Sequence, residues 1–120
     1  KQIKGKKINR LILNFNWCRK INSSQYYSDH PYLSNEAAQL IVEKGCKLLG
    51  MDTPMPDNPK NGHGCTLDSP IHKILLKNNC VIVEYLCNVY KIKKKIIDLI
   101  VAPLNIKDGD GAPSRVLGIY

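Results

Sequence analysis

The chain has 120 residues, of which 43% are hydrophobic and 23% are charged, and these values predict one globular domain. Apolar residues occur along the whole sequence, which argues against a disordered chain, and no apolar run reaches the roughly 18 residues of a membrane span. The net charge of +8 attracts anions in general, but no nucleic-acid-binding motif accompanies it, so we expect neither a membrane nor a nucleic acid as the main partner.

The first half of the chain predicts a strand, a loop, a helix and a second strand. RLILNFNW (10–17) is apolar with β-branched and aromatic members, as in a buried strand, whereas residues 21–34 are polar and predict a loop. Ser34 is a favourable N-cap, apolar residues then recur at helical spacing, and Gly45 suits the position just past the helix end. The apolar segment CKLLGM (46–51) predicts a short strand.

The second half predicts a long loop, a helix and three strands. The loop covers 52–69 and carries several prolines and glycines, and a loop of this length in a compact domain is usually functional. Ser69 predicts the cap of a helix over 69–79, with Pro70 in the first position, where its missing N–H costs nothing. The predicted strands are 80–86, 94–104 and 114–120. This order predicts an α/β or α+β domain with a mixed sheet and flanking helices.

Chemically versatile residues gather in GHGCTLDSPIH (62–72). One hypothesis is a thiol nucleophile, Cys65, with His63 or His72 as its base, but no sequence signal lowers the pKa of this thiol. Asp68 is either a ligand or a helix cap, and we favour the cap. Asp52 follows a predicted strand, at the end where sites of α/β proteins collect.

His72 and Glu84 form the second candidate pair. His72 falls in the first turn of a predicted helix, where the dipole disfavours imidazolium, so we expect a neutral ring that is ready to bind a metal. Glu84 interrupts the apolar strand VIVEYL, where a carboxylate is costly unless it is paired or coordinated. From these residues alone, an edge strand with Glu84 facing water and His72 capping the helix is the simpler interpretation.

The cysteines and the lysine runs carry weaker signals. Five cysteines without any Cys-x-x-Cys argue against a disulfide framework or a zinc ribbon and favour a reducing, cytoplasmic compartment, with secretion left open. The basic N-terminal run lacks a small-residue cleavage site and is not interpreted as a signal peptide. An alternative hypothesis is nucleic-acid binding, steeply dependent on salt, through a basic surface formed by the second lysine run, Lys91, Lys93, Lys94 and Lys95.

Three blocks of the sequence together resemble a known family. SNEAAQLIVEKGCKLLGMDTP, SPIHKILLKNNCVIVEYLCNVYKI and IVAPLNIKDGDGAPSRVLGI are similar in order and spacing to the C-terminal half of the cyclase family. This family includes metal-dependent kynurenine formamidases and isatin hydrolases, and the resemblance runs from about Asn9 to the end. It implies a partial swivelling α/β fold of the kynurenine formamidase type, with residues 1–120 forming a single cyclase-like domain.

The resemblance also implies a site and an activity. Family members bind one or two divalent ions, often zinc or manganese, and hydrolyse an amide or a cyclic amide. Most ligands come from an N-terminal His-x-Gly-Thr-His-x-Asp-x-Pro-x-His motif, and a C-terminal histidine and glutamate correspond to His72 and Glu84, which are 12 residues apart here. GHGCTLDSPIH imitates the N-terminal motif, but Gly62 and Thr66 replace its leading histidines.

The N-terminal half with its metal motif is absent, so the implied ligand set is incomplete. We therefore expect a small-molecule amide substrate and either a homo-oligomer or a second chain that carries the N-terminal half. The competing explanations are a fragment of a longer protein, a split subunit, or a non-catalytic binding or scaffold remnant. In each case we expect exposed apolar surface that the missing half would cover.

Overall fold

The computed structural model describes residues 7–62 and 64–120. The chain divides into two compact units, residues 1–90 and 91–120, which are described separately. No helix in the described part of the chain is both long and apolar enough to span a bilayer. That all 120 residues form a single domain stays a prediction.

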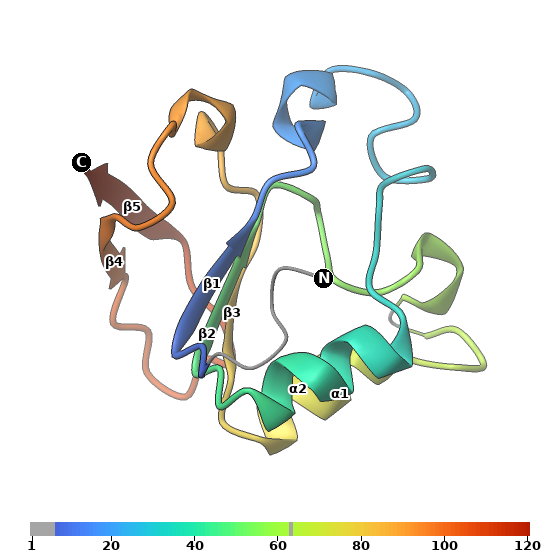
Figure 1. Ribbon diagram of the computed structural model, residues 1–120. Coiled ribbons are helices and arrows are strands. Elements are labelled where there is room, and N and C mark those ends of the chain that lie inside the picture. Colours follow the sequence, from blue (N-terminus) through green and yellow to red (C-terminus); the bar gives the residue numbers. More distant parts are fainter. Residues whose placement is uncertain (1–6, 63) are drawn as a thin grey trace. The chain divides into compact units, whose positions relative to one another are not determined.

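The first unit contains a three-stranded parallel sheet in the order β1 (Arg10–Leu13), β2 (Leu48–Met51) and β3 (Val81–Val83). Helices α1 (Asn35–Glu43) and α2 (Pro70–Lys77) connect these strands in turn. Consecutive parallel strands joined by crossovers of one hand carry their helices on the same side, and both helices lie together on one side of the strands (Figure 1).

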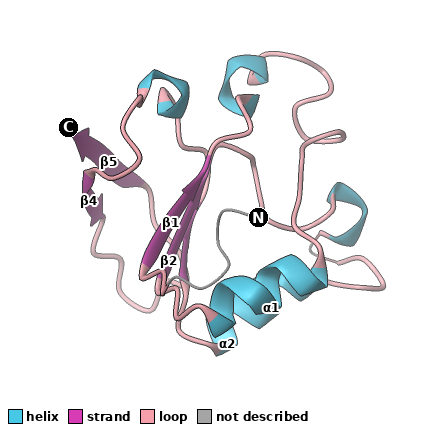
Figure 2. Ribbon diagram, in the orientation of Figure 1, coloured by secondary structure: helices cyan, strands magenta, loops and turns pink. Residues whose placement is uncertain are grey.

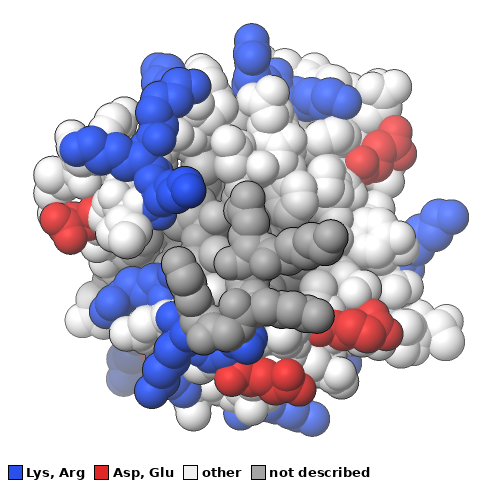
Figure 3. Space-filling model, in the orientation of Figure 1, with Lys and Arg blue, Asp and Glu red and all other residues white. Residues whose placement is uncertain are grey.

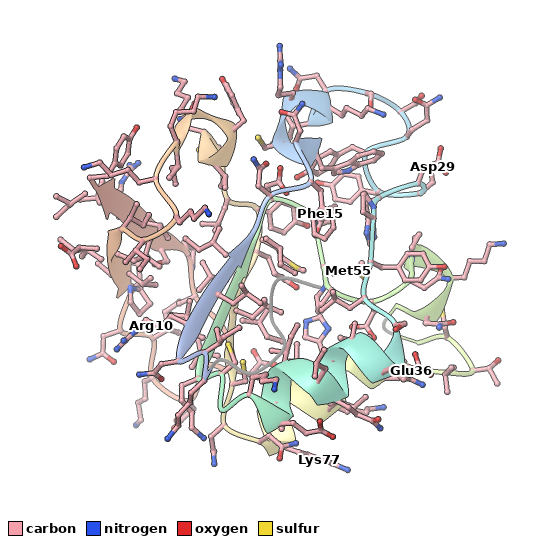
Figure 4. All side chains as sticks on the ribbon, in the orientation of Figure 1. Arg10, Phe15, Asp29, Glu36, Met55 and Lys77 are labelled. Carbon is pink, nitrogen blue, oxygen red and sulfur yellow. The ribbon has the colours of Figure 1, made fainter. Side chains whose placement is uncertain are left out.

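The core of this unit lies between the helices and the sheet. Ala38 and Ile41 of α1 and Leu75 of α2 are buried against Leu49 and Met51 of the central strand. The outer faces carry polar residues together with the exposed Leu40 and Leu76, and Figure 4 shows Glu36 and Lys77 at the surface of their helices. The predicted cap of α1 is confirmed, because the Ser34 hydroxyl accepts the Ala37 N–H at 3.2 Å.

Short 3-10 helices, which no pattern in the sequence predicts, occupy the loops (Figure 2). They are η1 (Trp17–Lys20), η2 (Pro59–Asn61) and η3 (Val89–Lys91). The strand predicted over 10–17 ends at Leu13, because Asn16 takes a left-handed conformation with φ 58°.

Asp52 is the reason that the chain turns here. Its carboxylate is fully buried and accepts the backbone N–H groups of Phe15 at 2.8 Å, Trp17 at 2.7 Å and Cys18 at 3.4 Å. The carboxylate therefore holds the start of η1 over the end of β2. Its position after a strand is as predicted, but its contacts are structural.

The first part of the long loop is an interior segment. Residues 52–57 are buried except for Met55, which is half-buried, and Figure 4 shows Met55 and Phe15 within the first unit. The Tyr85 N–H donates to the Thr53 carbonyl at 3.0 Å and the Leu86 N–H donates to the Met51 carbonyl at 3.0 Å. The chain after β3 thus continues beside the chain after β2, although Tyr85, with φ 55°, ends the strand predicted over 80–86.

The second unit is an antiparallel ribbon of β4 (Asp98–Pro103) and β5 (Ser114–Ile119), in which Ile100 faces Leu117 and Val101 faces Val116. The side chains of Ile92 and Ile97 lie over Gly118 on one face. Apolar residues nevertheless remain exposed in this unit, as expected: Ile96, Ile100, Leu104, Ile106, Leu117 and Ile119.

The predicted fold class, an α/β arrangement with parallel and antiparallel strands and flanking helices, is confirmed. In the described residues, however, the parallel and antiparallel strands belong to two sheets rather than one.

Replacing the buried Asp52 should destabilise the chain. We expect Asp52→Ala to lower the free energy of unfolding by about 3 kcal/mol, because it leaves buried backbone N–H groups without their charged acceptor. Asp52→Asn should cost less, since its amide oxygen still accepts. Urea denaturation followed by circular dichroism measures both, and equal losses in the two variants would contradict this role.

Candidate functional site

Glu84 lies at the carboxyl end of the parallel sheet. It follows Val83, the last residue of β3, and precedes Tyr85, whose left-handed backbone turns the chain. A positive φ at a bulky residue is uncommon and costs energy, so the surrounding structure must hold this turn in place. The turn lets Glu84 leave the strand while Leu86 returns to bond with Met51.

The start of α2 is capped by a residue from far back in the loop. Ser69 is the N-cap residue as predicted, but its side chain makes no cap hydrogen bond, and its hydroxyl donates to Asp68 at 2.7 Å instead. Asp57 supplies the cap, with Oδ1 accepting the Ile71 N–H at 2.6 Å and Oδ2 accepting the His72 N–H at 3.2 Å. Ser69 therefore occupies the predicted N-cap position, but the side-chain hydrogen bonds that cap the helix come from Asp57.

The same Asp57 carboxylate also binds the His72 ring. His72 Nδ1 is 2.6 Å from Asp57 Oδ2, and the Asp57 side chain is fully buried. On the other side of the ring, His72 Nε2 is 3.2 Å from Glu84 Oε1. The two residues predicted to converge therefore lie together, with Asp57 as a third member.

Both carboxylates raise the pKa of His72. Its pKa moves from the ordinary histidine value of 6.5 to about 9, mainly through the hydrogen bond to Asp57 and then through Glu84, against an opposing effect of burial. The expectation that the helix dipole keeps His72 neutral is wrong for the chain without metal, because two adjacent negative charges outweigh a partial positive one.

The geometry of His72 and Glu84 fits an edge of a metal coordination sphere. Two ligands about 2.0–2.1 Å from a tetrahedral ion lie roughly 3.3–3.4 Å apart, close to the separation of Nε2 and Oε1. Glu84 Oε1 is buried and, despite its nearness to the ring, accepts no well-aligned hydrogen bond in the described residues. A histidine whose Nδ1 is held by a carboxylate, with Nε2 turned to a second acidic group, is the arrangement that orients metal-binding histidines.

The ligand set is incomplete. Across residues 7–62 and 64–120, no group of three or more His, Cys, Asp or Glu side chains is arranged to hold a metal ion. A catalytic zinc site normally has three protein ligands and an open position. His72 and Glu84 therefore provide part of a site, and Asp57 supports it from behind.

No contact in the described residues supports the hypothesis that Cys65 is a nucleophile activated by a histidine. Cys65 is exposed on the loop before α2, and its N–H donates to the Gly62 carbonyl at 3.1 Å. In the described part of the chain, the His72 ring contacts Asp57 and Glu84, and His63 lies outside the described residues. The basic surface is visible in Figure 3, where Lys and Arg side chains stand out on the face shown.

Comparison with known proteins identifies relatives of this fold. The family model described as a putative cyclase matches residues 1–58. The structure of an isatin hydrolase bound to the product analogue thioisatinate has a TM-score of 0.79 at 24% identity, over 93% of this chain and 46% of that one. No curated protein sequence matches the chain.

Two further solved structures are similar. A potential metal-dependent hydrolase with cyclase activity has a TM-score of 0.56 at 27% identity, over 72% of this chain and 40% of that chain. A predicted metal-dependent hydrolase from Bacillus stearothermophilus has a TM-score of 0.61 at 19% identity, over 89% of this chain and 60% of that chain. The chain thus spans about half the length of the solved structures it matches.

The raised pKa of His72 predicts a pH-dependent stability for the metal-free chain. Imidazolium is favoured in the folded state, so its stabilising contribution is fully present below pH 6.5 and is lost as the pH rises through about 9. We expect the free energy of unfolding to fall across this window, and the fall to shrink in His72→Gln. Urea titrations in a chelating buffer measure it. Lys73→Gln, an exposed change on the same helix, should retain the fall, and a His72→Gln profile as steep as the wild type would contradict the prediction.

Proposed function

We propose that this chain is a member of the cyclase family and that His72 and Glu84 are ligands of a divalent metal ion in a hydrolase that cleaves a carbon–nitrogen bond. The observation that carries the proposal is the 3.2 Å approach of His72 Nε2 to the buried Glu84 Oε1, with Nδ1 held by Asp57. The solved relatives described as metal-dependent hydrolases support a divalent metal, for which zinc and manganese are the candidates.

Each of the three residues has a distinct task. Asp57 accepts the Nδ1 proton, which leaves the Nε2 lone pair for the ion and fixes the plane of the ring. Glu84 contributes negative charge from the end of β3, and a bound ion would offset the cost of keeping its Oε1 away from water. A bound divalent ion would supply Lewis-acid polarisation of a substrate carbonyl and a lower pKa for an attacking water.

The substrate proposed is a small amide, either an aryl formamide of the N-formylkynurenine type or a cyclic amide. The isatin hydrolase with its product analogue supports the cyclic class, because isatin contains a five-membered ring amide. The N-formylkynurenine alternative would give the chain a role in tryptophan catabolism. Both substrates present a carbonyl that a metal polarises and a C–N bond that water cleaves.

A complete site needs ligands beyond those in the described residues, so we further propose that another polypeptide segment completes it. The segment belongs to a longer protein of which this sequence is a part, to a second copy of this chain or to a separate chain with the N-terminal half of the fold. Exposed apolar side chains of β4 and β5, such as Ile100 and Leu117, supply surface for such an association. The alternative function, a non-catalytic binding or scaffold module, is favoured by the same incomplete ligand set.

Substitutions at the two proposed ligands test the metal site. We expect His72→Ala and Glu84→Gln each to abolish metal retention, measured by inductively coupled plasma mass spectrometry after desalting of the completed assembly, and to abolish amide hydrolysis. Each removes a ligand charge or lone pair while the fold, followed by circular dichroism, remains. Cys65→Ser is the matched control and should keep both metal and turnover.

Three results would contradict the proposal. Glu84→Gln with unchanged metal content and rate would show that Glu84 is merely solvated. Cys65→Ser that loses activity while keeping its metal would favour a thiol mechanism. Full metal retention without hydrolysis of any amide tested would favour the binding module.

The exposed apolar surface predicts that the isolated chain associates. We expect size-exclusion chromatography with light scattering to give a mass above that of one chain, or a monomer that binds a dye sensitive to apolar surface. Ile100→Lys with Leu117→Lys should reduce both signals, because the charges disfavour burial of this face. A wild-type monomer without dye binding would be evidence against a missing covering segment.

A further inference from the structure

Two cysteines outside the proposed metal site lie on neighbouring segments of the first unit. Cys18 belongs to η1, and Cys87 lies between β3 and η3. Aromatic contacts join these segments on either side of Cys18. The Arg19 guanidinium is 5.4 Å from the centre of the Tyr90 ring, and the Tyr26 ring is 6.5 Å from that of Trp17 and 6.3 Å from that of Tyr85.

Asn88 lies beside both cysteines. Its side-chain amide donates to Cys87 Sγ at 3.8 Å, and its backbone N–H is close enough to the Cys18 thiol to lower the pKa of that thiol. The amide nitrogen of Asn88 is bonded to the carbonyl carbon of Cys87. The Cys18 sulfur therefore lies near the main chain of Cys87, and a disulfide between the two requires their Cα atoms to be within about 7 Å.

The two thiols differ in accessibility. Cys87 is exposed and Cys18 is half-buried, whereas Cys46 and Cys80 are buried in the core and are shielded from oxidants. Burial raises the pKa of the Cys18 thiol, the Asn88 hydrogen bond lowers it, and the nearby Asp52 and Cys87 raise it. An oxidant therefore reaches the exposed Cys87 thiol before the half-buried Cys18 thiol, which remains protonated.

We propose that Cys18 and Cys87 form a redox-active thiol pair that closes to a disulfide when the chain meets a peroxide. The exposed Cys87 sulfur attacks the peroxide, the O–O bond breaks, and Cys87 becomes a sulfenic acid with release of water. The Cys18 sulfur then attacks the Cys87 sulfur, the S–O bond breaks, and a second water leaves. Two thiols are oxidised and one hydrogen peroxide is reduced to two waters.

The disulfide would constrain the segment that carries the proposed metal ligand. Glu84 lies three residues before Cys87, and the left-handed residues Tyr85 and Asn88 form the bends of this segment. A bond from Cys87 to η1 fixes that segment at its far end and cross-links distant parts of the sequence. The formation of the pair does not depend on the metal or on hydrolysis, so it stands even if the proposed function fails.

The test is to treat the reduced full chain with a small excess of hydrogen peroxide, block the remaining thiols by alkylation, and map the peptides by mass spectrometry. We expect a peptide pair joined through Cys18 and Cys87, which disappears on reduction, and a higher thermal midpoint for the oxidised chain than for the reduced one. Cys18→Ser and Cys87→Ser should each lose the linked peptides and the shift. Cys65→Ser, which removes another exposed thiol, should keep both.

Other outcomes would overturn the proposal. A wild-type chain whose dominant linkage joins Cys87 to Cys65 or to a second chain, or whose Cys87 oxidises further without any link to Cys18, contradicts the pair. The wild-type peptide map decides this without reference to the folding of any variant.

Discussion

The Asp57 carboxylate is the group on which the candidate site depends. This fully buried side chain accepts hydrogen bonds from the first free N–H groups of α2 and from the Nδ1–H of His72. The start of the helix and the orientation of the ring are therefore set together. A capping carboxylate is favoured by the positive end of the helix, and the same charge favours a histidine whose other nitrogen faces Glu84. Without this group, the helix would lose its cap and the ring would lose its fixed direction.

A second buried carboxylate acts in the same way a few residues earlier. Asp52 binds the backbone of η1 while Asp57 binds the backbone of α2, and both belong to the interior segment that continues from β2. The chain after the central strand therefore anchors the chain after β1 and the start of α2 through short charged hydrogen bonds. Loops at the carboxyl end of a parallel sheet need such anchors to hold a site.

Local signals were sufficient to predict the regular elements. Ser34 and Gly45 bound α1, Pro70 begins α2, and the apolar runs that contain β1, β2 and β3 are visible in the sequence. The strand ends were missed, because Asn16 and Tyr85 adopt left-handed conformations that only long-range hydrogen bonds to Asp52, Met51 and Thr53 explain. Propensity and periodicity describe neighbours in the chain, and these contacts join residues far apart in it.

The site was predicted in part for the same reason. The helix position of His72 and the apolar flanks of Glu84 mark them as unusual, and the resemblance paired them, whereas nothing local distinguishes Asp57 from the other polar residues of its loop. The role of His72 and Glu84 as ligands is tested most directly by manganese titration of the isotope-labelled chain, followed by amide NMR spectra. The account predicts that paramagnetic broadening begins at the amides of His72 and Glu84 and is much weaker in Asp57→Asn. Broadening that begins elsewhere, or that is the same in this variant, would contradict it.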